Sequence, residues 1–104
     1  MAASDLWVET HQGLVRADQI VHVETNKPTM SVNTATALGN IEKLSDDRWF
    51  TETHWYGIYS GDEEERRTVA IALVQEIALR SRNDVPGLIK VQQDSGAVSF
   101  EPFA

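Results

Sequence analysis

The sequence predicts an α+β domain. We expect an antiparallel sheet of about five to seven short strands packed on one long helix, at about residues 62–82, followed by a C-terminal β-hairpin. Apolar and polar residues alternate in several stretches before residue 60, and this period of two is typical of half-buried strands. From Asp62 the period becomes three and four, which is typical of an amphipathic helix. The 104 residues fit a single domain, 1–104.

The N-terminal part predicts two or three short strands. Residues 6–11 alternate, with Trp7, Glu9 and His11 on one face. The stretch His11-Gln12-Gly13 suits a hairpin turn, because Gly13 adopts positive φ without steric cost. A further strand is expected at residues 20–25. Pro28 favours a turn after this strand, because proline has no N–H to donate to the hydrogen-bond ladder of a sheet.

The middle of the chain predicts more strands. Residues 31–38 alternate between two faces, neither of which is strongly apolar or charged. Residues 41–44 suit a short strand. Residues 48–59 are rich in aromatic and β-branched residues, which indicates one long strand or two segments broken by a bulge. Gly57 inside this stretch marks a bulge or a close backbone approach.

The helix is predicted from an apolar stripe, from charge and from its caps. Three glutamates open it and two arginines close it, which matches the helix dipole. Two pairs have capping-box spacing, Ser60 with Glu63 and Asp62 with Glu65, so two start points compete. The stripe is formed by Val69, Ala70, Leu73, Val74, Ile77 and Ala78. Ile71 widens this stripe, so we expect the apolar face of the helix to pack against a sheet rather than against another helix.

The C-terminal segment predicts a hairpin. Ile89 and Val91 would share a face with Val98 and Phe100 across a turn at residues 93–96. By element order alone, the chain is also similar to small pleckstrin-homology-like domains. This similarity implies an alternative fold, a partial barrel with one helix.

Composition restricts the function classes. With no cysteine, the chain has no disulfides, thiol catalysis or thiolate-ligated zinc. The net charge of −7 is spread along the chain, which argues against phosphate-mediated nucleic-acid binding and against anionic membranes. The chain also lacks an apolar run long enough to span a bilayer and a secretory signal at its start. We expect a cytoplasmic protein without a cofactor.

Two loose clusters are candidates for chemistry. If the first strand pairs with the strand at 20–25, then Glu9, His11, His22 and Glu24 would converge on a metal-binding site. These residues also suit the water-facing side of a sheet.

The second cluster lies in the aromatic stretch 49–59. His54, Glu52 and Tyr56 share one side of the strand, an arrangement that suits acid–base chemistry in a pocket. We favour a simpler explanation, an exposed edge-strand face or a core histidine with one hydrogen bond, because neither a nucleophile nor an oxyanion-hole motif accompanies the pair.

Association is the interpretation that we favour. The chain has three tryptophans, Trp7, Trp49 and Trp55, which is a large number for so small a core. We therefore expect at least one of them to be exposed, and exposed tryptophan is enriched at interface hot spots. Strand edges at residues 31–38 and in the terminal hairpin suit pairing into a homodimer. We therefore predict a small non-catalytic interaction or assembly module that self-associates or binds another protein. The alternatives are a small-molecule-binding protein or enzyme with a pocket near 49–59, and an acidic inhibitor that mimics nucleic acid.

Overall fold

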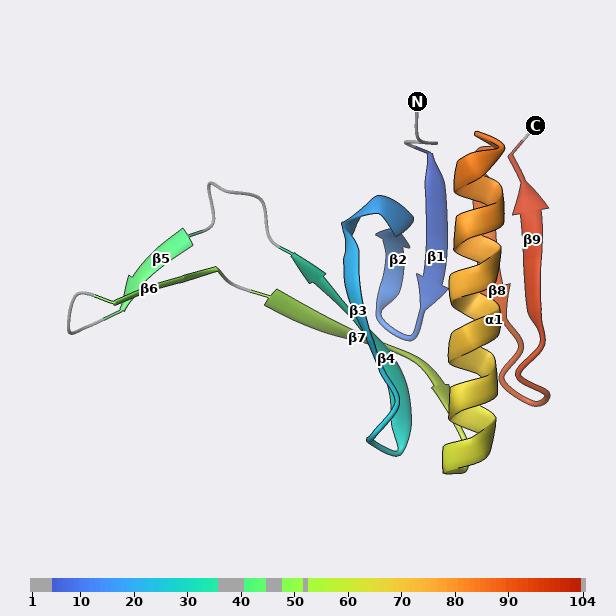
Figure 1. Ribbon diagram of the computed structural model, residues 1–104, viewed down its shortest axis with the longest axis horizontal. Coiled ribbons are helices and arrows are strands. Elements are labelled where there is room, and N and C mark those ends of the chain that lie inside the picture. Colours follow the sequence, from blue (N-terminus) through green and yellow to red (C-terminus); the bar gives the residue numbers. More distant parts are fainter. Residues whose placement is uncertain (1–4, 36–40, 45–47, 52, 104) are drawn as a thin grey trace.

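The computed structural model describes the backbone of residues 5–35, 41–44, 48–51 and 53–103, and the side chains of residues 5–34 and 55–103. Within these residues the chain forms nine strands, one 3-10 helix and one α-helix (Figure 1). The predicted α+β class is confirmed, and the described strands do not close into a barrel. The elements are β1 (Leu6–Thr10), β2 (Gly13–Arg16), η1 (Ala17–Gln19), β3 (Ile20–Glu24), β4 (Thr29–Ala35), β5 (Ile41–Leu44), β6 (Arg48–Thr51), β7 (Thr53–Ser60), α1 (Glu63–Arg82), β8 (Gly87–Val91) and β9 (Val98–Pro102).

The strands are divided between two main sheets and a ribbon. The first sheet has the order β2-β1-β8-β9, and the second has the order β3-β4-β7. All described pairs are antiparallel except β1 with β8, which is parallel. Alternation along a strand predicts which residues face inward, but it does not specify the partner strand or its direction.

Strands β5 and β6 form a separate two-stranded ribbon (Figure 1). The aromatic stretch 48–59 is thus two segments, β6 and β7, that belong to different sheets. The second sheet also corrects one expectation. Because β4 lies between β3 and β7, the described part of the 31–38 stretch is not a pairing edge, whereas β9 of the terminal hairpin is one.

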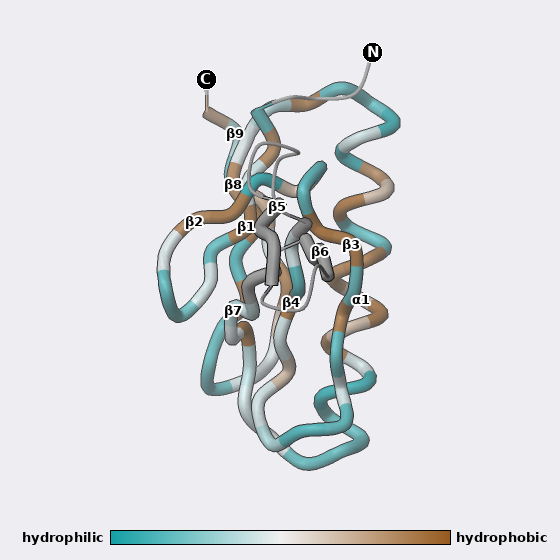
Figure 2. Tube along the Cα trace, turned by 90° about the vertical axis from the view of Figure 1, so that its left-hand side faces the viewer, coloured by the Kyte–Doolittle hydropathy of each residue, from teal (hydrophilic) through white to brown (hydrophobic). Residues whose placement is uncertain are grey.

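The core lies between the two sheets and α1. Strand β1 buries Leu6 and Val8 and turns Trp7 and Glu9 to the other face, as the alternation predicts. Hydrophobic bands of α1 lie beside the hydrophobic part of β3 (Figure 2). The largest fully buried side chains are Leu6, Met30, Ile58, Leu73, Ile89, Val8 and Val32.

The helix begins where one of the two competing capping boxes places it. Asp62 is the N-cap: its Oδ1 accepts a hydrogen bond from the Glu65 N–H at 2.8 Å, and Glu65 Oε1 accepts one from the Asp62 N–H at 3.0 Å. Ser60 instead belongs to β7, where its hydroxyl lies 3.0 Å from that of Thr29. The helix buries Val69, Ala70 and Leu73, but Ile71 is exposed, so the wider stripe expected from the sequence is wrong at that position.

The C-terminal hairpin has the predicted register. Ile89 lies opposite Phe100, and Val91 lies opposite Val98. The hairpin is fixed to the helix by Arg80, whose guanidinium carbon lies 4.2 Å from the centre of the Phe100 ring, a cation–π contact. Arg80 is itself held by Glu76 one helical turn earlier, at 2.6 Å.

The turn between β1 and β2 docks on β7 at Gly57 and so joins the two sheets. The His11 N–H donates to the Gly57 carbonyl at 2.8 Å, and the Gly57 N–H donates to Gln12 Oε1 at 2.8 Å. A Cβ at Gly57 would lie 2.9 Å from His11 Nδ1 and 3.1 Å from Thr29 Cγ2. The pairing of β4 with β7 also shifts register beside Gly57. Both readings predicted for this glycine, a bulge and a close backbone approach, are therefore confirmed.

Gln93 extends this junction to the first sheet. Its Nε2 donates to the carbonyls of Ile58 and Val91 at 2.9 and 3.0 Å. Its Oε1 must then be the atom that accepts from His11 Nε2 at 2.9 Å, because only the amide nitrogen can donate to carbonyls. This assigns the Nε2–H tautomer, or the protonated ring, to His11. One side chain thus bonds to β7, to β8 and to the β1–β2 turn.

We predict that Gly57→Ala lowers the free energy of unfolding by about 1–3 kcal/mol, because the new methyl group overpacks the junction. The closest atom belongs to the His11 side chain, so Gly57→Ala should cost less in a His11→Ala background. Urea unfolding of the two single variants and the double variant measures this coupling. Strictly additive effects would show that His11 does not limit the space at Gly57.

We predict that Asp62→Ala lowers stability by about 0.5–2 kcal/mol, since it removes the N-cap. Ser60→Ala is the matched control, because it removes the oxygen of the competing capping register. It should cost less than Asp62→Ala in urea unfolding. The reverse order would place the functional cap at Ser60.

Candidate functional site

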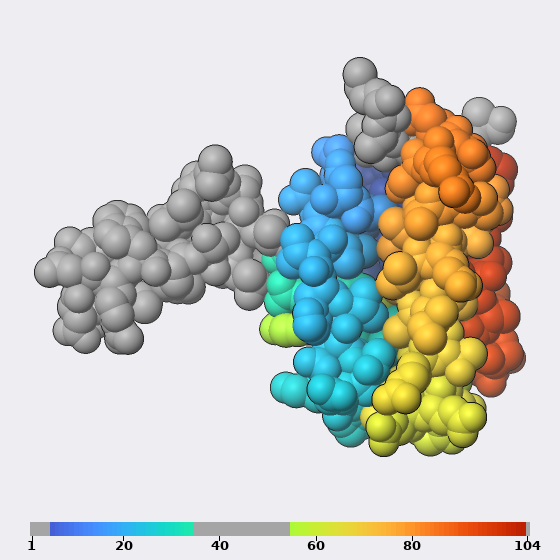
Figure 3. Space-filling model, in the orientation of Figure 1, coloured from blue at the N-terminus to red at the C-terminus, as the bar shows by residue number. Residues whose placement is uncertain are grey.

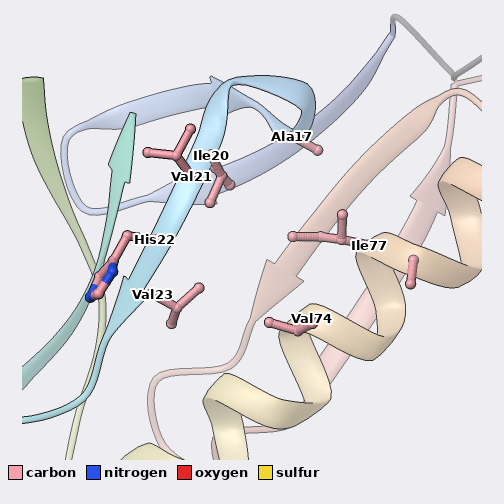
Figure 4. A pocket seen from close by; sticks show the side chains of 8 residues that line it. Ala17, Ile20, Val21, His22, Val23, Val74 and Ile77 are labelled. Atoms are coloured by element: carbon pink, nitrogen blue, oxygen red, sulfur yellow. The ribbon is translucent and has the colours of Figure 1, made fainter. Parts of the chain in front are cut away.

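An apolar groove of about 420 Å³ lies between β3 and α1. The two elements run side by side on the face shown in Figure 3. In close view, Val23 of β3 and Val74 and Ile77 of α1 point toward one another across the groove, whereas His22 points away from the helix (Figure 4). The lining residues are Ala17, Ile20, Val21, His22, Val23, Val74, Ile77 and Ala78.

The groove exists because the apolar stripe of α1 is longer than the surface that covers it. Val69, Ala70 and Leu73 fill the core, but Val74 is 50% exposed and Ala78 is exposed. On the opposite wall, the pairing of β3 with β4 shifts register between Ile20 and His22. Val21 lies at this irregularity and is 62% exposed.

Arg66 joins the start of α1 to the residue that follows β3. Its Nε donates to the Thr25 carbonyl, just after β3, at 3.0 Å, and its Nη1 donates to the Gly61 carbonyl at 2.6 Å. The first turn of the helix is thus tied to the end of β3. Val74, Ile77 and Ala78, which line the groove, lie about two to three turns further along α1.

Strand β3 has an unpaired edge along the groove. Within the described residues it pairs with β4 alone, and α1 lies on the other side of the groove (Figure 4). An edge strand presents a row of backbone N–H and C=O groups that have no ladder partner. The site therefore combines backbone hydrogen-bonding groups on one wall with apolar side chains on both walls.

The aromatic residues predicted as a pocket or interface are separated by the structure. Trp55 lies opposite Asn33 and is 52% exposed, while its neighbour Tyr56 lies opposite Val32 and packs against the core. The Trp55 ring meets the His22 ring edge to face, with centroids 5.8 Å apart. Trp7 is half-buried on β1, which belongs to the other sheet.

A second, smaller hollow of about 250 Å³ adjoins Trp55 and is lined by Glu24, Lys27 and Ser31 as well. The Glu24 carboxylate already has polar partners at this hollow. It accepts a hydrogen bond from the Asn26 N–H at 2.9 Å, and it lies 4.0 Å from His22 Nε2.

The predicted acid–base cluster lies largely outside the described residues. The structure does not describe Glu52, and it gives only the backbone of His54 and Trp49, in β7 and β6. His54 pairs with Thr34 in the ladder. The role of His54 and Glu52 in catalysis remains a hypothesis from the sequence.

The predicted metal cluster depended on pairing between the first strand and β3, and this pairing is not found. Strand β1 pairs with β2 and β8, so Glu9 belongs to the first sheet and His11 to the turn after β1, whereas His22 and Glu24 belong to the second sheet. His11 is bonded to Gln93. Within the described part of the chain, His, Asp and Glu side chains do not gather into a group of three that could hold a metal ion.

Comparisons with known proteins give no relative: no protein-family model, curated protein or solved structure matches the chain. Among the described residues, α1 is too polar to cross a membrane.

Sequence reasoning missed the groove, although one signal for it is present. The apolar stripe of the helix continues to Val74, Ile77 and Ala78, beyond what a single sheet face covers. The exposure of Val21 follows from the register shift next to it, and a strand sequence does not show where such a shift occurs.

We predict that Arg66→Gln lowers stability by about 1–3 kcal/mol, because two carbonyls lose a charged donor. The neighbouring Arg67→Gln is a matched control, since the ion pair that Arg67 makes within the described residues, with Glu63 at 3.8 Å, is exposed. Its cost should stay below about 1 kcal/mol. Equal costs in urea unfolding would show that Arg66 does not fix the helix to the end of β3.

Proposed function

We propose that the protein is a protein-interaction module that self-associates, and that its binding surface is the groove together with the edge of β3. The observation that carries this proposal is the coincidence of an unpaired strand edge with an apolar groove beside it. Exposed strand edges are sites of strand addition, and exposed apolar patches on small proteins mark binding surfaces.

The form of the groove favours an extended polypeptide segment as the occupant. Such a segment would pair its backbone with β3, and alternate side chains would enter the space between Val23 and Val74. Main-chain hydrogen bonds would supply affinity, and the apolar walls would supply specificity. A small apolar ligand would use the same walls but would leave the edge of β3 unpaired.

Burial of Val21 and Val74 would drive the association. Both side chains are half or more exposed in the single chain. Covering each one removes apolar surface from water, with a gain of about 25 cal/mol for each Å². A charge at either position would have to be desolvated in the complex, at a large cost.

We predict that wild-type protein at micromolar concentration has a dimer mass by multi-angle light scattering. Val74→Asp and Val21→Asp should weaken the dimer by about tenfold or more, since each buries a carboxylate in an apolar groove. Leu14→Asp is the matched control, because Leu14 on β2 is 56% exposed but lies outside the groove.

Leu14→Asp should leave the dimer mass unchanged. A monomeric wild-type protein would contradict self-association, and a dimer disrupted only by Leu14→Asp would move the interface to the first sheet. Far-UV circular dichroism of each variant confirms that the fold is retained.

A further inference from the structure

We propose that the segment received by the groove is the β5–β6 ribbon of a second copy of this chain, so that two copies exchange ribbons in a closed dimer. This inference rests on the proposed function, because it names the occupant of the same groove. Three observations support it, two from the described backbone and one from the sequence.

First, the ribbon lacks a third strand. Strands β5 and β6 pair with each other, and within the described residues neither pairs with another strand. A two-stranded hairpin alone is marginally stable in water, and a third strand or a packing surface is needed to stabilise it. A surface supplied by a second copy would therefore stabilise the ribbon.

Second, the two edges match in length. Strands β5 and β6 have four residues each, and β3 has five. At about 3.3 Å per residue, either ribbon strand covers most of β3. The ladder formed would continue the sheet β3-β4-β7 by one or two strands.

Third, the ribbon sequence suits an apolar groove. Its strands, IEKL and RWFT, contain Ile41, Leu44, Trp49 and Phe50 among eight residues. Strand addition places alternate residues of the added strand toward one side, so part of this apolar set would meet the groove walls at Val23 and Val74.

Reciprocal exchange also closes the assembly. Each copy has one ribbon and one groove, so a two-fold arrangement fills both grooves and gives each ribbon a third strand. A head-to-tail arrangement would instead leave one ribbon and one groove at the ends and would continue to larger species.

Disulfide trapping between two differently tagged copies tests the occupant. The native chain has no cysteine, so each introduced thiol is the only one in its chain. One copy carries Val21→Cys in the groove, and the other carries a cysteine in β5 (Glu42→Cys or Lys43→Cys) or in β6 (Arg48→Cys or Trp49→Cys). Because adjacent strand residues face opposite sides, one position of each pair faces the same side as Val21, whichever ribbon strand pairs with β3.

After the copies are mixed and oxidised with oxidised glutathione, we expect a covalent heterodimer on a non-reducing gel. Its yield should exceed that with a Leu14→Cys partner by roughly tenfold or more, because association raises the local thiol concentration. The Leu14→Cys chain is the control, since that position is equally exposed on another sheet.

The possible results separate the two proposals. In one case, Val74→Asp disrupts the dimer, but Val21→Cys traps the ribbon no better than Leu14→Cys does. This result would overturn the ribbon as occupant and leave the groove as the interface. Efficient trapping of Val21→Cys with itself would indicate direct β3–β3 pairing and would also overturn ribbon exchange. A trimer or larger species would contradict the closed dimer, and a monomer at every concentration would overturn both proposals.

Discussion

The contact between the β1–β2 turn and Gly57 is the constraint on which the arrangement of the two sheets depends. Two backbone-directed hydrogen bonds, from His11 and to Gln12, hold this turn against β7. They form only because Gly57 lacks a side chain, which lets the turn approach to a distance where a methyl group would meet His11. Gln93 then links the same point to β8, so the first sheet is fixed on the second at a polar junction next to Ile58 of the core.

The helix is held at both ends, and between these anchors one side of it borders the groove. At the start, the Asp62 cap and Arg66 fix it to the end of β3. At its last turns, Arg80 stacks on Phe100 of β9. Between these anchors α1 packs Leu73 into the core, while Val74, one residue on, is rotated by about 100° and lines the groove. The helix wall of the groove is thus the part of the apolar stripe that the core leaves exposed.

Local features of the sequence predict the elements well because their causes are local. The capping boxes restrict the helix start to two positions, and the register of Ile89 with Phe100 follows from alternation across a short turn. Gly57 shows how far such reasoning reaches: the sequence indicates a bulge or a close approach, and the structure adds that His11 is the neighbour. The metal cluster failed for the complementary reason, since it required β1 to pair with β3, and strand partners are chosen by the whole fold.

The sequence by itself determined the α+β class, the extent and polarity of α1, the inward faces of β1 and of the terminal hairpin, and the absence of cysteine chemistry. All of these depend on spacing along one segment or on composition. Only the tertiary structure decided that the strands form two sheets, that β1 runs parallel to β8, and that β3 is an edge beside the helix. Pairing partners and uncovered edges depend on contacts between residues distant in sequence, and the periodicity of one strand carries no information about its neighbour. The groove between Val21 and Val74 belongs to this second group, because its walls come from segments about fifty residues apart.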